Sequence, residues 1–162
     1  MTENIKMPLE GIKVIELATV VAAPTAGRML SAYGAEVIKI ESLAGDDYRV
    51  AGNFERVVCE DYKNPLFTIQ NSGKKLTSIN LKHPDGKAAM LKLLEDADVF
   101  LTNVRTGGLQ RLGLDYESLH ERYPKLVYAH FSGFGPKGPV ASNPGFDSTA
   151  FWLRSGPMAD WQ

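Results

Sequence analysis

The first hydrophobic pattern along the chain, in residues 11–41, predicts a strand, a loop, a helix and a second strand. Lys13–Leu17 and Glu36–Glu41 are short apolar runs with β-branched residues, which is typical of buried strands. The small residues between them predict a helix over residues 24–33, because proline suits the first helical turn and a glycine commonly follows the last. Two strands joined by such a crossover predict a parallel βαβ unit, whose loop and helix N-terminus lie where α/β proteins bind ligands.

The later pattern repeats this alternation, so the fold class we expect is α/β, with a Rossmann-like parallel sheet and flanking helices. Residues 42–72 follow neither the helical period of 3.6 residues nor the strand period of two for long. Asn64-Pro65 indicates a turn there. So long an excursion in a compact domain is often functional. Further strands are expected at residues 76–82, 99–102 and 126–131, and further helices at residues 83–95, 109–112, 116–122 and 148–153.

Composition is ordinary for a soluble protein, with 162 residues of which 44% are apolar and 23% charged. The net charge of −1 gives no footprint for nucleic acid or an anionic membrane, so we expect neither as a partner. The longest uncharged run near the start, residues 17–27, is far below the roughly 18 residues of a membrane span. No signal peptide is recognisable, and the single Cys59 fits a reducing, cytoplasmic location.

Two common kinds of site are disfavoured by the sequence. The loop at residues 18–24 lacks the glycines of a dinucleotide fingerprint, and only Glu41 stands where such a fold puts its ribose-binding acid. A nicotinamide domain is therefore a weak alternative, and there is no P-loop motif. His83, His120 and His130 are far apart in the sequence, so we expect no metal site and structural roles for all three.

Basic residues close to glycines are candidates for holding phosphates. The alternative for each one taken singly is a solvated surface side chain. Lys82 and Arg105 gain weight because both follow predicted strands at the carboxyl edge of the sheet. The candidates are Lys74, Lys75, Lys82, Arg105 and Arg111.

The motifs, read in order, resemble one known family over nearly the whole chain. They are PLEGIKVIEL, GAEVIKIES, GKKLTSINLKHPDGK, ADVFLTNVRTGGLQRLGLDYESL, PKLVYAHFSGFGPKGP and PGFD. This order closely resembles the class III CoA-transferases, a family that also contains α-methylacyl-CoA racemases. The sequence is most similar to the branch that moves CoA between 2-hydroxy acids and acyl-CoA, the (R)-2-hydroxyisocaproate and (R)-phenyllactate CoA-transferases of amino-acid fermentation.

The resemblance implies a CoA-binding wall and no permanently bound cofactor, with coenzyme A thioester as substrate and a small carboxylic acid as second substrate. Arginine and lysine near helix N-termini suit the several negative charges of an ADP-3′-phosphate. The residues carried over from the family are Val21, Ala22, Ile79, Asn80, Leu81, Lys82, Asn103, Val104, Arg105, Arg111, Asn143, Pro144, Gly145 and Phe146.

Two departures from the family pattern are informative. Some members place an arginine for the diphosphate directly after the second strand, where this chain has Ser42. Racemases carry a catalytic histidine after the glycine of the G-x-D segment, and here Gly145 is followed by Phe146. Without that histidine a two-base proton shuttle at the α-carbon is not available, which favours transferase over racemase.

The family's nucleophile is an aspartate in a later glycine-rich loop, which forms an acyl anhydride and then an aspartyl-CoA thioester. By resemblance it lies beyond Gln162, since Asp147 and Asp160 come too early, so we expect no catalytic residue within this chain. We expect residues 1–142 to form the N-terminal part of the CoA-binding domain and residues 143–162 to lead to the catalytic loop. The intact protein is expected to be a homodimer, and the 162-residue chain alone to be inactive. A non-catalytic CoA-binding module remains the alternative.

Overall fold

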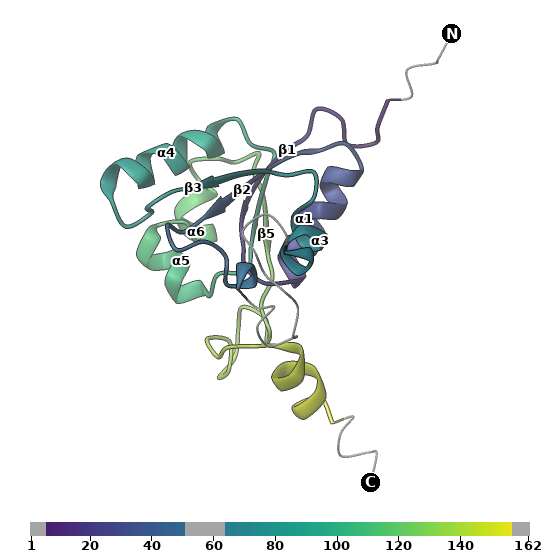
Figure 1. The fold of residues 1–162 in the computed structure, drawn as a ribbon. Helices are drawn as coiled ribbons and strands as arrows, with labels where there is room; N and C mark the ends of the chain where they lie inside the picture. Colours follow the sequence, from purple (N-terminus) through teal and green to yellow (C-terminus); the bar gives the residue numbers. More distant parts are fainter. Residues whose placement is uncertain (1–5, 51–63, 157–162) are drawn as a thin grey trace.

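A computed structural model describes residues 6–50 and 64–156 of the chain. Within this part, five parallel strands form one sheet in the order β3-β2-β1-β4-β5 (Figure 1). Every neighbouring pair runs parallel, as the βαβ pattern predicts. The strands are β1 (Lys13–Leu17), β2 (Glu36–Glu41), β3 (Lys75–Ser78), β4 (Val99–Thr102) and β5 (Val127–His130).

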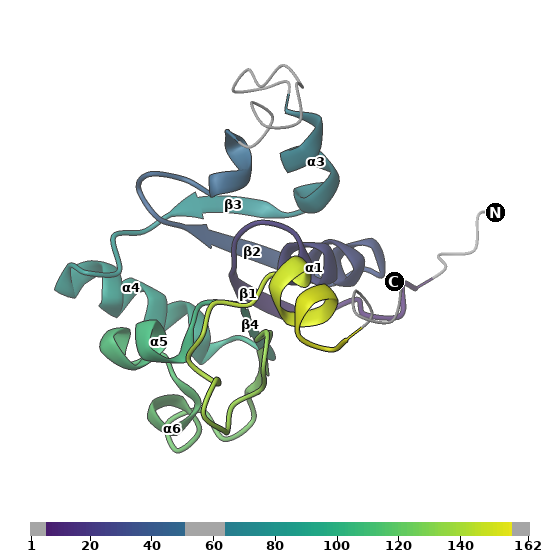
Figure 2. The same ribbon diagram turned by 90° about the horizontal axis from the view of Figure 1, so that it is seen from below.

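Helices cover both faces of the sheet, as Figures 1 and 2 show. On one face lie α1 (Ala22–Ala32) and α3 (Pro65–Asn71), and on the other lie α4 (Pro84–Glu95), α5 (Thr106–Leu112) and α6 (Tyr116–Leu119). A short 3₁₀ turn, η1 (Asp47–Arg49), follows β2, and a π-helix, η2 (Ser148–Leu153), follows the long loop after β5. The predicted α/β class with a Rossmann-like parallel sheet is confirmed.

The core has two parts because successive side chains of a buried strand point to opposite faces of the sheet. In β1, Val14 packs in the cluster under α1, whereas Ile15 packs in the cluster under α4 and α5. Both side chains are fully buried. The apolar runs read from the sequence therefore serve a sheet that is covered on both sides.

The predicted boundaries are accurate for β1, β2 and β4 and less so elsewhere. The strand expected at residues 76–82 ends at Ser78, and α1 begins at Ala22 instead of near Pro24. The turn expected at Asn64-Pro65 is wrong, because this pair begins α3: the Asn64 side chain accepts a hydrogen bond from the Phe67 backbone N–H. Part of the excursion over residues 42–72, including Cys59, lies outside the described residues.

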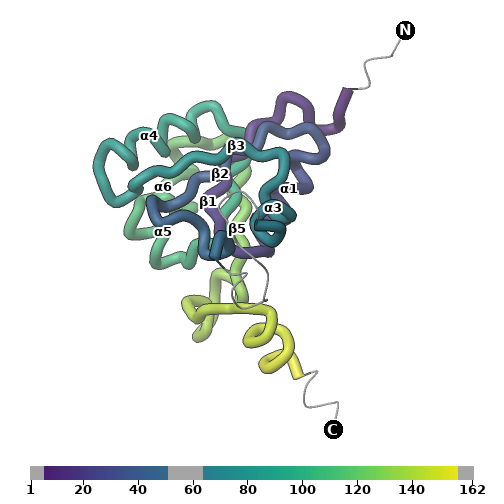
Figure 3. The backbone as a smooth tube through the Cα atoms, in the orientation of Figure 1, coloured from purple at the N-terminus to yellow at the C-terminus, as the bar shows by residue number. Residues whose placement is uncertain are grey.

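After β5 the chain continues below the carboxyl edge of the sheet and leads to η2 (Figure 3). The helix expected over residues 148–153 is present, in π-helical form. A Cβ atom on Gly133 would lie 2.5 Å from the Gly145 Cα atom, so both positions need glycine where the two backbones cross. The final Trp161-Gln162 lies outside the described residues. No helix in the described ranges is long and apolar enough to cross a bilayer.

Tyr128 links the sheet to the segment before α6, because its hydroxyl donates to the Leu114 carbonyl over 2.9 Å. Burial raises the pKa of Tyr128 above its usual value. The unfolded tyrosine ionises near pH 10 whereas the folded one keeps its proton, so the free energy of unfolding should fall as the pH rises above about 10. We expect Tyr128→Phe to reduce this alkaline loss, measured by urea unfolding at pH 9 to 11. An unchanged slope would contradict the assignment.

Candidate functional site

The candidate site lies at the carboxyl edge of the sheet, where all five parallel strands end on the same side. Strands β1 and β4 are neighbours, yet the chain leaves them toward opposite faces, to α1 after β1 and to α5 after β4. Such a switch in direction opens a crevice in which α/β proteins bind ligands. The loops after β1, β3 and β4 thus bring most of the predicted CoA-binding residues to one edge.

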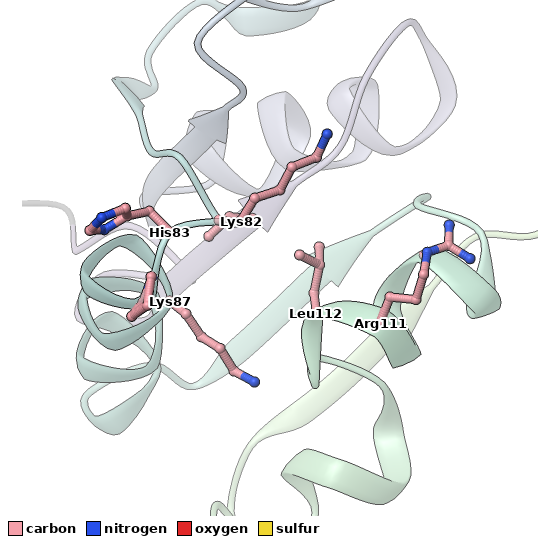
Figure 4. Close-up of a pocket in the computed structure, with 8 residues that line it drawn as sticks. Lys82, His83, Lys87, Arg111 and Leu112 are labelled. Atoms are coloured by element: carbon pink, nitrogen blue, oxygen red, sulfur yellow. The ribbon is translucent and has the colours of Figure 1, made fainter.

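An open cavity of about 640 Å³ lies between the β3–α4 loop and α5 (Figure 4). Its size is within the range of small-molecule and cofactor sites. Its apolar wall comes from both sides, with Leu81 before α4 and Leu112 at the end of α5. The lining residues are Leu81, Lys82, His83, Pro84, Lys87, Gly108, Arg111 and Leu112.

The cavity is strongly positive. Lys82, Lys87 and Arg111 contribute three fixed charges, and none of the described lining residues is acidic. Within the part of the chain that the structure describes, none of these three cations forms an ion pair. Lysine and arginine side chains without ion-pair partners, next to the apolar wall of Leu81 and Leu112, suit a ligand that carries phosphates and a ring system.

The start of α4 shapes one side of the cavity. His83 is the N-cap residue, and its Nδ1 accepts from the Asp85 backbone N–H over 3.3 Å. Gly86 lets the helix approach the preceding loop, since a Cβ atom there would lie 2.1 Å from the Asn80 carbonyl oxygen. The free N–H groups of this first turn add partial positive charge beside the lysines.

On the other side, α5 presents Arg111 in its last turn. Lys87 reaches across from α4: its Nζ atom would lie 2.8 Å from a Cβ atom placed on Gly113, the residue that ends α5. Figure 4 shows Lys87 extending into the gap between the two helices. The two helices therefore supply cations to one cavity from opposite walls.

The cavity includes three of the residues predicted from the sequence, Leu81, Lys82 and Arg111. It also includes His83 and Lys87, which were not predicted as ligands; the signal for Lys87 was its position one turn after Pro84. Other predicted residues lie elsewhere at the carboxyl edge. Ile79 and Val104 are partly buried against the core, Arg105 precedes α5, and Val21 and Ala22 begin α1. Asn143, Pro144, Gly145 and Phe146 lie in the loop before η2 and are exposed.

Two of the candidate phosphate ligands have other partners. The Lys74 side chain is fully buried and pairs with Glu16 at 2.7 Å, so the prediction of a phosphate-binding role for Lys74 is wrong. Lys75 pairs with Glu36 at the edge of the sheet. Spacing from glycines did not distinguish these two from Lys82 and Arg111, because burial depends on the pairing of β3 with β2.

A buried cluster of charges lies next to the site, between β1, β2 and the segment before β3. Lys39 Nζ lies 3.2 Å from Glu16 Oε1 and 2.8 Å from Asp46 Oδ2, and all three side chains are fully buried. Lys74 Nζ lies 2.7 Å from Glu16 Oε2 and donates a hydrogen bond to Glu16 Oε1 over 3.0 Å. Burial raises the pKa of Glu16 and lowers the pKa of Lys74, while each partner opposes that shift. The cluster balances two positive against two negative charges.

The cluster leaves no room beside Gly27 in α1, where a Cβ atom would lie 1.9 Å from Glu16 Oε2. That carboxylate is held by two lysines and cannot move cheaply. We expect Gly27→Ala to lower the free energy of unfolding by about 1 to 3 kcal/mol, as overpacking does. Gly107→Ala in α5 is the matched control, since its Cβ atom would meet only Arg111 at 3.7 Å. Equal melting temperatures of the two variants would contradict the expectation.

Glu41 and the histidines serve the fold. Both Glu41 carboxylate oxygens accept from the Arg49 guanidinium at 2.8 Å, so this carboxylate is already paired. His83 caps α4 as expected, and His130 lies in β5 with Nε2 2.9 Å from the Val104 carbonyl oxygen. Among the described residues no group of three or more His, Cys, Asp or Glu side chains could hold a metal ion.

Comparison with known proteins shows to which family the chain belongs. The sequence model of CoA-transferase family III matches residues 9–160. The chain belongs to CoA-transferase family III. The predicted class III resemblance is thereby confirmed, and the cationic cavity lies in the part of the chain that matches family III.

Two relatives are named as CoA-transferases of 2-hydroxy acids. The chain is 45% identical over 150 residues to (R)-2-hydroxy-4-methylpentanoate CoA-transferase of Clostridioides difficile, covering 93% of this chain and 38% of that protein. It is 48% identical over 154 residues to cinnamoyl-CoA:phenyllactate CoA-transferase of Clostridium sporogenes, covering 95% and 37%. This chain therefore spans less than two fifths of the length of these relatives.

The fold is likewise that of the family. The crystal structure of a CAIB/BAIF family protein from Brucella suis matches with a TM-score of 0.80 and 39% sequence identity, over 88% of this chain and 38% of that one. The crystal structure of Rv3272 from Mycobacterium tuberculosis matches with a TM-score of 0.76 and 36% identity, again over 88% and 38%. The parallel sheet described above is thus the family III arrangement.

Proposed function

We propose that the intact protein is a CoA-transferase that moves CoA between an acyl-CoA and a carboxylic acid. The observation that carries this proposal is the cavity between α4 and α5, in which Lys82, Lys87 and Arg111 surround an apolar floor without ion-pair partners among the described residues. A CoA nucleotide carries phosphates beside a flat ring, which matches this combination. Membership of family III supports the same reading.

The acceptor we propose is an (R)-2-hydroxy acid such as 2-hydroxyisocaproate. The support is the activity for which two relatives at 45% and 48% identity are named, the transfer of CoA to or from 2-hydroxy acids. Phe146 also supports transfer over racemisation, because a phenyl ring cannot accept a proton from the substrate α-carbon. No permanently bound cofactor takes part, and the protein works as a cytoplasmic homodimer.

The chemistry we propose uses an aspartate beyond Gln162. Its carboxylate attacks the thioester carbonyl, the C–S bond breaks, and CoA leaves as a thiolate, so that the aspartate and the donor acyl group form a mixed anhydride. The thiolate then attacks the aspartyl carbonyl, which releases the donor acid and forms an aspartyl-CoA thioester. The acceptor carboxylate repeats these two steps in reverse and leaves as its CoA thioester. Residues 1–142 hold CoA during this exchange, and residues 143–162 lead to the catalytic loop.

The test is an exchange assay on the intact protein with isocaproyl-CoA as donor and (R)-2-hydroxyisocaproate as acceptor, followed by chromatography of the CoA esters. We expect the 2-hydroxyacyl-CoA to form only when both substrates are present, and the (S)-enantiomer to be a poor acceptor. Epimerisation of a 2-methylacyl-CoA without any acceptor acid would refute the proposal. The 162-residue chain alone should show CoA binding without turnover.

A further inference from the structure

The loop between β1 and α1 contains a strained residue. Val20 has a φ of +69°, and it is the one non-glycine residue with positive φ in the described ranges. A β-branched side chain is strongly disfavoured in this left-handed region, so surrounding contacts must hold the conformation. The loop leads directly to Val21 and Ala22, which the resemblance to the family predicts to contact CoA.

Three side chains, from β2 and from the segments after β2 and β4, hold the backbone around Val20. Lys39 of β2 donates to the Ala18 carbonyl over 2.6 Å. Asn103 after β4 accepts from the Thr19 N–H over 3.0 Å and donates to the Thr19 carbonyl over 2.8 Å. The Val20 N–H itself donates to Asp46 Oδ1 over 3.1 Å.

Asp46 holds the strained Val20 through this hydrogen bond. Neighbouring groups in turn hold Asp46 in place. Its Oδ2 pairs with Lys39, and its Oδ1 also accepts from the Tyr48 N–H over 2.9 Å. Its own N–H donates to Glu41 Oε2 over 3.0 Å. The residue is only 2% exposed, so water does not compete for these bonds.

The held loop lies at the carboxyl edge of the sheet and leads into α1. The Val21 carbonyl accepts the first helical hydrogen bond of α1, from the Thr25 N–H over 2.8 Å, while the residue is 37% exposed. The side-chain amide of Asn103 forms both of its hydrogen bonds with the Thr19 backbone, so Asn103 tethers the β1–α1 loop to the end of β4.

We propose that Asp46 is a positioning residue: its buried carboxylate holds Val20 in the left-handed conformation and so fixes the β1–α1 loop for CoA. This rests on the proposed function, because it takes CoA to be the ligand of that loop. Two separate roles follow for one side chain. The Oδ1 atom positions the loop, and the negative charge balances Lys39.

The test is CoA binding to the intact protein by calorimetry, for three variants at Asp46 and Val20. Asp46→Ala should weaken CoA binding about tenfold. Without the hydrogen bond from Asp46 the loop relaxes, and the free energy needed to restore its strained conformation then opposes binding. Asp46→Asn keeps an oxygen for the Val20 N–H and should stay within about threefold of the wild type. Asp46→Ala combined with Val20→Gly should recover most of the lost affinity, since glycine adopts positive φ without strain. A merely structural role would give no such recovery.

Asp47→Ala is the matched control, since this exposed neighbouring carboxylate does not touch the loop. A wild type that does not bind CoA would refute the proposed function. A wild type that binds, with Asp46→Ala equal to it, would refute only the positioning role. If Asp46→Ala does not fold, Asn103→Ala tests the same loop: affinity restored by Val20→Gly supports the proposal, and affinity not restored contradicts it.

Discussion

Lys39→Met should lower the free energy of unfolding by about 3 to 5 kcal/mol, because it leaves buried Glu16 and Asp46 carboxylates without their shared partner. Methionine fills a similar volume, so the loss reports the missing charge and not a cavity. Lys74 still pairs with Glu16, whereas Asp46 keeps no ion pair at contact distance within the described residues. The measurement is urea unfolding followed by circular dichroism.

Lys75→Met is the matched control for this change. Lys75 also pairs with a glutamate, Glu36, but its side chain is 71% exposed and water screens the pair. We expect its free energy of unfolding to stay within about 0.5 kcal/mol of the wild type. Equal losses in the two variants would show that burial does not decide the energy of these pairs.

Arg111→Met should weaken CoA binding about tenfold to a hundredfold, as expected for the loss of a hydrogen bond to a charged group. Arg111 lines the cavity from α5 and has no ion-pair partner among the described residues, so its charge is available to a phosphate. Lys82→Met should act in the same direction from the opposite wall. Calorimetric titration of the intact protein with CoA measures both.

Lys92→Met provides the control for Arg111→Met, since Lys92 is exposed on α4 and does not line the cavity. Its CoA affinity should equal that of the wild type. The difference between wild type and Arg111→Met should also shrink as ionic strength rises, because salt screens an exposed contact. A uniform loss in all three variants would indicate a general charge effect and would contradict a specific site.

The central strands were predictable because their signal is local. β1, β2 and β4 are short, apolar and β-branched, and burial on both faces of the sheet requires this composition. The start of α3 was missed although Asn64 and Pro65 are good N-cap and first-turn residues. The helix is too short to show an apolar period, so its two start residues were also compatible with a turn.

The buried charge cluster was detectable in principle. Glu16 and Lys39 each interrupt an apolar run, and opposite charges within neighbouring buried strands should pair. Register places Lys39 directly beside Glu16, but register is a property of the assembled sheet. The third and fourth members, Asp46 and Lys74, come from loops whose path no local pattern determines.

The same distinction applies to the candidate site. Lys82 and Arg111 were predicted both as basic residues close to glycines and through the resemblance to the family, and they lie in one cavity. Lys87 was missed because nothing in the sequence distinguishes it from other helical lysines. Its place in the cavity depends on the position of α5 relative to α4. Asn103 was predicted to contact CoA, and its hydrogen bonds to Thr19 show a tether that only the three-dimensional structure reveals.

The central claim, that the cavity between α4 and α5 holds CoA, is tested most directly by lysine acylation of the intact protein with and without saturating CoA. Mass spectrometry of the peptides reports each lysine. We predict that CoA protects Lys82 and Lys87, which line the cavity, and leaves the labelling of exposed Lys75 and Lys92 unchanged. Equal labelling of Lys82 and Lys87 in the presence and absence of bound CoA would contradict the account.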